Sequence, residues 1–222
     1  IIKKMENICV AKDFEKQFSP KLIEEVVNLV EKPHVIICKF DEIYLKIPQE
    51  ILIVNMQQHQ KYFPLFDNNH KLTNSFLLVA NLADKKGYIK IGNQRVIEAR
   101  FSDAQFFWEK NKTQNLVKQV SKLKNLVFFN ELGNFYDRTQ RLRKLAAIIS
   151  GQMNLSKEKI EIAASVCKAD LISDLVGEYP ELQGVMGKYF AKEQGFDDDV
   201  ALAISDHYLP VGISSPVPKK QI

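Results

Sequence analysis

The sequence contains few cysteines: only Cys9, Cys38 and Cys167 among 222 residues. Their number is odd, they lie far apart, and they form no CxxC motif or Cys/His cluster. This pattern argues against a disulfide framework and against a structural zinc site. We expect three small, buried side chains in a reducing compartment, which means a cytoplasmic location.

Long apolar runs are also missing. No run approaches the roughly 20 residues that a membrane-spanning helix needs, and the N-terminus, IIKKMENICV, lacks the layout of a signal peptide. We therefore expect no membrane partner. The first residue is not Met and the last residues, SSPVPKKQI, resemble a linker, so we interpret the chain as an internal part of a longer protein.

Familiar catalytic motifs are absent as well. The sequence has no GxxxxGK[ST] loop, no GxGxxG after a predicted strand, no HExxH and no GxSxG. Its four histidines are His34, His59, His70 and His207, and only His207 lies in the helical half. A single histidine such as His59 more often has a structural role than a metal-binding one. We expect no catalytic residue and no metal site, although a Ser-His-Asp triad assembled by the fold stays open.

The composition is that of a globular protein, with 45% hydrophobic and 26% charged residues. A chain of this length can bury a core without disulfides or metal ions. The net charge of +4 permits an anionic partner such as a nucleic acid but does not require one.

The residues from Leu22 to Asn81 show a mixed pattern. The segment LIEEVVNLV has helical spacing and ends before Pro33, and PQEILIVNMQQH predicts a short helix that starts at Pro48. Two hairpins are also predicted. The first joins HVIICKF to IYLKI, and the second joins KYFPLF to SFLLVAN across DNNHKLTN.

The pattern becomes helical from Gly92 onward. The first helix has an apolar stripe of Ile97, Phe101, Ala104 and Trp108. Thr113 is predicted as the N-cap of the next helix. A longer helix is predicted to end at Gly151, and its apolar face consists of Phe135, Leu142, Leu145, Ala146 and Ile149. Another helix is predicted from about 156 to 177.

These patterns predict an α+β fold, in which a small mixed strand/helix region precedes an all-helical bundle. We assign residues 1–91 to the mixed region, as part of a larger N-terminal domain. Residues 92–210 form the helical domain, and residues 211–222 form a linker.

Two carboxylates stand out in the predicted helix at 156 to 177. On a helical wheel, Asp170 and Asp174 fall within the apolar sector, and an unpaired buried carboxylate is costly. Arg138 and Arg100 point toward apolar stripes of their own helices, so we predict that one of them pairs with Asp170 or Asp174. The alternative is a helix end or loop that lets both carboxylates reach water.

Four stretches together resemble the β subunit of bacterial glycyl-tRNA synthetase. They are QHQKYFPLF, GNQRVIEARFSDAQFFWEKN, LGNFYDRTQRLRKLAAIIS and KADLISDLVGEYPELQGVMGKYFA. The likeness runs in order from about Leu22 to Pro210. It implies an internal part of that subunit, without the N-terminal part and the C-terminal anticodon-binding part.

The resemblance implies a division of labour. The α subunit of this family carries the aminoacylation centre and uses ATP and magnesium, whereas the β subunit supplies most of the tRNA contacts. The expected partners are therefore the α subunit and glycine tRNA. The chain would be a tRNA-facing, architectural module of this ATP-dependent ligase, without a cofactor and without catalytic activity of its own.

The helical region of this family is also similar to the HD phosphohydrolase fold. Enzymes of that fold bind a metal ion through histidines and aspartates, including a His-Asp dipeptide. In this sequence the dipeptide position reads Ala169-Asp170, and the preceding helix offers Arg138 and Arg141 but no histidine. The resemblance implies a lost metal site whose carboxylate remains for structural reasons.

Binding of tRNA needs exposed cations, and aromatic residues can add stacking. The candidates are Lys61, which adjoins two aromatic residues, and a group of helical residues: Lys118, Lys122, Lys124, Arg141, Arg143 and Lys144. Three alternatives stay open. The cations form an ordinary solvated surface, the chain is a scaffold that binds the α subunit without touching RNA, or it is a metal-dependent phosphohydrolase.

Overall fold

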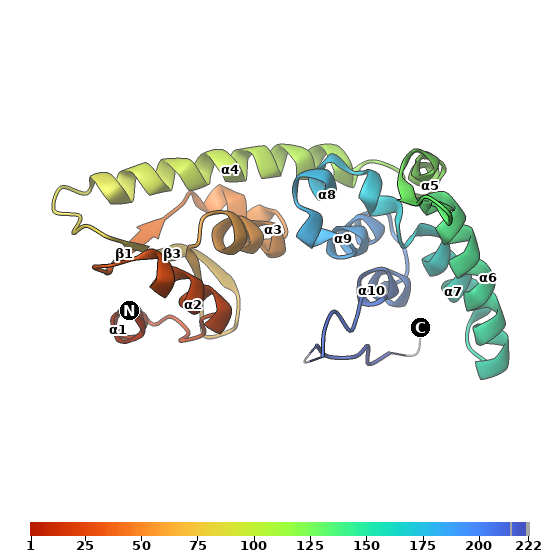
Figure 1. Cartoon of the computed structure of the whole chain (residues 1–222), viewed down its shortest axis with the longest axis horizontal. Coiled ribbons are helices and arrows are strands. Elements are labelled where there is room, and N and C mark those ends of the chain that lie inside the picture. The colour runs from red at the N-terminus through yellow and green to blue at the C-terminus, as the bar shows by residue number, and fades with distance from the viewer. Residues whose placement is uncertain (214, 221–222) are drawn as a thin grey trace. The chain divides into compact units, whose positions relative to one another are not determined.

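A computed structural model describes residues 1–213 and 215–220 of the chain (Figure 1). The chain divides into two compact units, Ile1–Phe106 and Phe107–Ile222. The division lies inside α4 (Tyr88–Lys112), beyond the boundary at 91/92 that the sequence suggested. The pattern changes near Gly92 because a helix begins there, whereas packing onto the sheet continues along that helix. The assignment of domains stays a prediction.

Unit 1 combines a small sheet with helices, as expected for an α+β protein. Its elements, in chain order, are α1 (Ile2–Lys12), α2 (Pro20–Leu29), β1 (His34–Lys39), the 3-10 helix η1 (Glu42–Lys46), α3 (Gln49–Val54), the π-helical turn η2 (Asn55–His59), β2 (Phe63–Phe66), β3 (Leu72–Ala80) and most of α4. The three strands form an antiparallel sheet in the order β1-β3-β2.

The two predicted hairpins have different outcomes. The second is confirmed, because β2 pairs with β3. The first is wrong: β1 pairs with β3 instead, and residues 42–46 form η1. The Asp41 side chain accepts a hydrogen bond from the backbone N–H of Ile43, and this cap starts a helical turn where the β-branched residues suggested a strand.

The sheet of unit 1 is buried on both faces. Successive side chains of β3 point to opposite faces. Leu77 packs into a cluster with residues of α1, α2 and β2: Met5, Cys9, Leu22, Val26, Phe63 and Leu65. On the other face, the ring of Phe76 stacks on Phe40 and Tyr62, and Phe101 of α4 meets Phe40 edge-on at 4.9 Å between ring centres. The predicted stripe of α4 is confirmed as buried.

Unit 2 contains the remaining helices. Its elements after α4 are α5 (Leu116–Val120), the 3-10 helix η3 (Ser121–Asn125), β4 (Val127–Phe129), β5 (Gly133–Asn134), α6 (Phe135–Met153), α7 (Lys157–Val166), the 3-10 helix η4 (Ala169–Ile172), α8 (Asp174–Glu178), the 3-10 helix η5 (Pro180–Leu182), α9 (Val185–Glu193) and α10 (Asp198–Asp206). The region is thus not all-helical, because β4 and β5 form a short ribbon. Gly133 has a φ of 81°, which lets the chain reverse before α6.

The helices of unit 2 pack in series. Helix α6 packs along α7, α7 packs against α10, and α10 packs against α9 (Figure 1). Trp108, the only tryptophan, stacks on Phe190 of α9 with ring centres 5.7 Å apart. None of the described helices is long and apolar enough to cross a membrane.

Two predicted helix ends and the continuity of one predicted helix are wrong in unit 2. Asn115, not Thr113, caps α5, since its side chain accepts from the N–H of Lys118. Helix α6 continues past Gly151 and ends where Asn154 takes the left-handed conformation, at φ 52°. The helix predicted from 156 to 177 is three shorter pieces, α7, η4 and α8. Ser173 ends η4 and caps α8, which breaks the continuous helix.

The predicted linker, 211–222, lies only partly within the described residues. Ser214, Gln221 and Ile222 lie outside them. The described residues of this stretch, 211–213 and 215–220, contain no helix or strand.

Candidate functional site

Asp170 is a buried helix cap. Only 1% of its surface is exposed, and its Oδ2 accepts hydrogen bonds from the backbone N–H groups of Gly184 at 2.5 Å and Gly187 at 3.3 Å. Gly184 is the N-cap residue of α9, and Gly187 lies in its first turn. N–H groups at a helix start lack partners within the helix, and the helix dipole favours a negative charge there. Asp170 therefore holds the start of α9 to η4.

This cap carries an electrostatic cost. Burial raises the pKa of Asp170 from 3.8 to about 6, although the two N–H donors and Lys168 oppose the change. Its other oxygen, Oδ1, is buried and has no hydrogen-bond partner among the described residues. The carboxylate thus supports the fold at the expense of some stability at neutral pH.

The two glycines of α9 allow this close approach. A Cβ atom on Gly187 would lie 2.6 Å from Ile204 Cγ2 and 3.1 Å from Asp170 Oδ2. Gly184 has a φ of 77°, and a Cβ there would lie 2.6 Å from Tyr208 Cδ2. The sequence Gly-x-x-Gly at 184–187 is therefore required by the packing of α9 against Asp170, α10 and Tyr208.

Asp174 has a different environment from Asp170. Its side chain is 44% exposed and forms an ion pair with Lys110 Nζ at 2.9 Å. It also accepts a hydrogen bond from Asn111 Nδ2 at 3.1 Å. The hydrogen bonds from Lys110 and Asn111, together with the positive charge of Lys110, lower the pKa of Asp174. Asp170 is thus buried, as the helical wheel predicted. The break in the helix lets Asp174 reach water, which is what the alternative of a helix end or loop predicted.

The structure gives both carboxylates partners other than the predicted arginines. The guanidinium of Arg138 lies 4.1 Å from the centre of the Phe128 ring. Arg100 belongs to unit 1 and is exposed. Among the described residues, none of the ion pairs includes Arg100 or Arg138. The predicted pair of Arg138 or Arg100 with Asp170 or Asp174 is therefore wrong: backbone N–H groups supply the hydrogen bonds of Asp170, and Lys110 and Asn111 supply those of Asp174.

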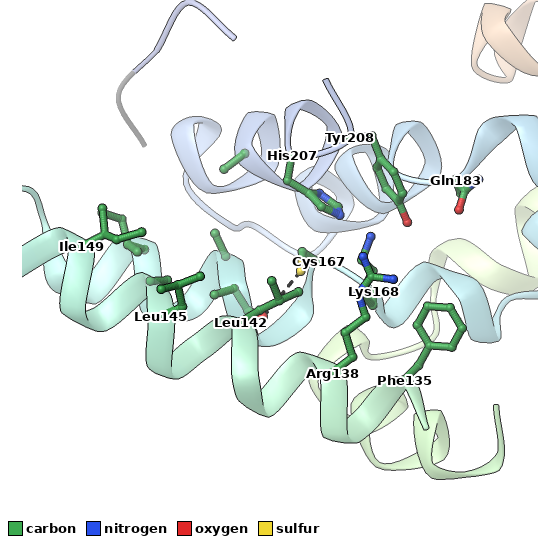
Figure 2. A pocket seen from close by; sticks show the side chains of 15 residues that line it. Phe135, Arg138, Leu142, Leu145, Ile149, Cys167, Lys168, Gln183, His207 and Tyr208 are labelled. Carbon is green, nitrogen blue, oxygen red and sulfur yellow. Dashed lines mark hydrogen bonds between the residues drawn. The ribbon is translucent and has the colours of Figure 1, made fainter. Parts of the chain in front are cut away.

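Beside Asp170, unit 2 contains an open cavity of about 580 Å³ between α6, α7 and the end of α10. One end is polar, and Arg138, Lys168, His207 and Tyr208 line it. Figure 2 shows the charged ends of Arg138 and Lys168 directed to the same part of the cavity, with His207 and Tyr208 on the opposite side. The other end is apolar, with Leu142, Leu145, Ala146, Ile149, Ala163 and Ala164.

Lys168 is an unusual residue of this cavity, because it is a buried cation with 3% of its surface exposed. Its Nζ lies 3.7 Å from the centre of the Tyr208 ring. Burial, with a contribution from Arg138, lowers the pKa of Lys168 to about 8. Among the described residues it has no ion pair and no side-chain hydrogen bond. The Tyr208 hydroxyl is also buried without a hydrogen-bond partner in the described part of the chain.

The cavity has little metal-binding character. Within residues 1–213 and 215–220, no group of three or more histidine, cysteine or carboxylate side chains is arranged to hold a metal ion. Partial burial and the neighbouring Lys168 lower the pKa of His207, which keeps it neutral near pH 7. Burial raises the pKa of Cys167 to about 11, so the thiol stays protonated.

The predicted RNA-binding cations divide between the two units. Lys61 lies in unit 1 and pairs with Glu25 at 2.8 Å. The others are exposed on α5, η3 and α6 of unit 2: Lys118, Lys122, Lys124, Arg141, Arg143 and Lys144. Because η3 packs against α6, these elements are neighbours. We call the six residues the basic surface.

Some members of the basic surface have partners within the chain. Lys124 Nζ lies 4.9 Å from the centre of the Tyr136 ring. Arg141 donates to the Leu132 carbonyl at 3.0 Å, and Arg143 donates to Gln140 Oε1 at 3.3 Å. Lys118, Lys122 and Lys144 have no such partner in the part of the chain that the structure describes, so their charges are available to an anion.

Several residues of this site were not singled out from the sequence. Lys168 precedes the dipeptide Ala169-Asp170, and its place in an apolar stretch was a usable signal. Gly184 and Gly187 were visible as a Gly-x-x-Gly pair at a helix start. Tyr208 gave no signal, because only the packing of the end of α10 brings it over Lys168.

Comparisons with known proteins place the chain among the subunits of aminoacyl-tRNA synthetases. A family profile described as "Glycyl-tRNA synthetase beta subunit" matches residues 1–222. The chain therefore belongs to the glycyl-tRNA synthetase β-subunit family, and the predicted resemblance is confirmed.

Individual relatives agree with this assignment. The chain is 45% identical over 204 residues to the glycine–tRNA ligase β subunit of Thermodesulfovibrio yellowstonii. The aligned region covers 91% of this chain and 30% of the relative. It is 45% identical over 202 residues to the corresponding subunit of Neisseria meningitidis serogroup C, covering 90% of this chain and 29% of the relative. The chain thus spans about 30% of the length of these relatives.

Proposed function

We propose that this chain is a tRNA-facing, architectural module of the β subunit of a glycine–tRNA ligase. In the complete αβ assembly, ATP-dependent attachment of glycine takes place on the α subunit, which uses ATP and magnesium. This chain then needs no cofactor and forms no glycyl-adenylate alone. We place the assembly in the cytoplasm, where three free, buried cysteines stay reduced.

The basic surface supports the tRNA part of this proposal. Lys118, Lys122 and Lys144 are exposed on neighbouring elements and lack ion-pair partners within the described residues. Cations of this kind bind phosphates by releasing the counterions condensed on the nucleic acid, so binding depends steeply on salt. Exposed lysine ammonium groups pair with phosphate oxygens, which favours contact with the RNA backbone rather than sequence readout.

A second candidate function rests on the apolar face of α6. Thr139 and Ser150 are its only buried residues in the described structure. Four large apolar side chains remain at least 43% exposed: Leu145, Ile148, Ile149 and Met153. Contiguous apolar surface of this kind is typical of protein interfaces. This face supports a scaffold that binds the α subunit without RNA contact.

Fluorescence anisotropy with labelled glycine tRNA tests the first function. We expect saturable binding to the 222-residue chain, stronger for glycine tRNA than for an unrelated tRNA, and weaker at 200 mM than at 50 mM salt by roughly one order of magnitude or more. A variant with Lys118, Lys122 and Lys144 each changed to Gln should reduce the salt slope by about 2 to 3. The matched control makes the same change at three exposed lysines of unit 1: Lys3, Lys12 and Lys16.

Two results would contradict the tRNA proposal. One is the absence of binding, and the other is binding that is equally strong for an unrelated tRNA. In either case, capture of the α subunit that resists nuclease treatment and is lost on changing Ile148 and Met153 to Ser would support the scaffold function instead.

A further inference from the structure

The cavity of unit 2 contains two cations without a counter-ion. Arg138 and Lys168 reach it from α6 and from the turn before η4, and both line its polar end (Figure 2). Their partners are aromatic rings: Phe128 for Arg138 and Tyr208 for Lys168. A ring supplies part of the solvation that a buried cation loses, but it supplies no negative charge.

The charged groups that face Lys168 come from every element around it. Arg138 on α6 repels it, Asp170 on η4 attracts it, and the Cys167 thiol and the His207 ring are neutral near pH 7. The charge of Asp170 is already engaged by the N–H groups of α9. The cavity therefore retains a net positive charge, and an anion bound there would relieve the repulsion between the two cations.

The hydrogen-bonding groups at this end suit a tetrahedral oxyanion. A guanidinium presents several N–H donors in a fixed plane, an ammonium provides a further charged donor, and both are common phosphate ligands. The Tyr208 hydroxyl lacks a partner among the described residues and provides a third kind of donor. Arg138, Lys168 and Tyr208 belong to separate segments, and all three line this one cavity.

The remainder of the cavity restricts the rest of the ligand. The lining here is apolar. Helix α6 contributes Leu142, Leu145, Ala146 and Ile149, and α7 contributes Ala163 and Ala164. The cavity volume of about 580 Å³ lies in the range of small-molecule sites. A ligand that fills it has an anionic head and an uncharged body, and a nucleotide has both.

We propose that this cavity binds a nucleotide, with its phosphate on Arg138, Lys168 and Tyr208 and its base against the apolar side chains of α6 and α7. The nucleotide is either free or part of an RNA strand. The inference does not depend on tRNA binding by the basic surface, because a free nucleotide satisfies it.

Calorimetric titration of the 222-residue chain with chemically defined probes tests the proposal. The probes are inorganic phosphate, adenosine 5′-monophosphate, adenosine, and short RNA oligonucleotides with and without a terminal phosphate. We expect the monophosphate to bind at least about tenfold more tightly than adenosine and phosphate to compete with it. A preference for the terminally phosphorylated RNA over the free nucleotide would identify a strand end as the source.

Three variants connect binding to the cavity. Lys168→Met keeps the length of the side chain and removes the charge, and it should weaken monophosphate binding by about tenfold or more. Tyr208→Phe removes only a hydroxyl that has no partner in the described structure, so the fold should be retained while affinity falls about fivefold. Lys157→Met, at the exposed start of α7 and outside both the cavity lining and the basic surface, is the matched control and should leave the affinity unchanged.

Other results would overturn the inference. It fails if none of the phosphorylated probes binds, if adenosine binds as tightly as its monophosphate, or if Tyr208→Phe folds normally and retains full affinity. Loss of tRNA binding in the variant of the basic surface, with monophosphate binding intact, would leave this site in place. The two proposals can therefore fail separately.

Discussion

Replacement of Asp170 by Asn and by Ala separates the two effects of this buried carboxylate. Asn keeps an oxygen that can accept the N–H groups of Gly184 and Gly187, but it carries no charge. Ala removes both the acceptor and the charge. Because the two variants are equally neutral, the difference in their free energies of unfolding reports the capping hydrogen bonds of α9.

The size of this difference follows from the contacts. Asp170 Oδ2 accepts two buried backbone N–H groups, at 2.5 and 3.3 Å. Each buried donor left without a partner costs about 1 to 3 kcal/mol. We therefore expect Asp170→Ala to be less stable than Asp170→Asn by about 2 to 4 kcal/mol, taking the longer bond as the weaker one.

The charge gives a second, pH-dependent difference, between the wild type and Asp170→Asn. The pKa of Asp170 is about 6 in the folded protein, above its ordinary value of 3.8. A carboxyl whose pKa is raised by folding binds its proton more tightly in the folded state, so stability rises as the pH falls through about 6. Between pH 7 and pH 5 the wild type should gain about 1 kcal/mol relative to Asp170→Asn.

Urea denaturation followed by tryptophan fluorescence measures both differences. The only tryptophan, Trp108, is buried against Phe190 in unit 2, so its emission reports the unit that contains Asp170. His207, whose pKa is lowered, favours the opposite trend as the pH falls, but it is present in both proteins and cancels. Equal stability of the Asn and Ala variants would refute the capping argument. A wild-type-to-Asn difference that stays constant from pH 7 to pH 5 would refute the raised pKa.

Three further predictions concern packing, capping and reactivity. Gly187→Ala should destabilise unit 2 by about 1 to 3 kcal/mol, because its Cβ would lie 2.6 Å from Ile204 Cγ2. In the same urea assay the control Gly177→Ala should be near neutral, since no heavy atom lies within 4 Å of the added Cβ. Asn134→Ala removes the capping box of α6 and should cost about 1 kcal/mol, measured by thermal melting; an unchanged melting temperature would contradict it. Cys167, buried and with its pKa raised to about 11, should react with a thiol reagent at pH 8 only after urea is added; fast reaction of the native protein would show an open site.

Local patterns predicted much of the secondary structure. The stripe of α4 was visible because a helix repeats its buried face every three to four residues, a signal contained within one element. The second hairpin was visible because two strand-like runs flank a turn-forming segment. The first hairpin failed because Asp41 caps a helical turn, and this local hydrogen bond outweighed the β-branched composition.

The candidate site was less accessible to such reasoning. The helical wheel placed Asp170 in the core, and that burial is confirmed, but it assumed one continuous helix where Ser173 starts a new one. The error misplaced Asp174, which lies beside Lys110 and is exposed. Arginines were the expected partners because opposite charges are the only partners that a sequence displays. Backbone N–H groups, which every residue has, cannot be recognised as partners in advance.

By itself, the sequence determined the α+β class, the family, the absence of familiar catalytic motifs and the burial of Asp170, because these depend on composition, ordered motifs and short-range periodicity. Only the tertiary structure decided what Asp170 contacts and which side chains form the cavity. Arg138, Lys168 and Tyr208 come from three separate segments, and they converge because α6, α7 and α10 pack side by side. Such contacts between distant residues depend on how helices pack, and no local pattern contains that information.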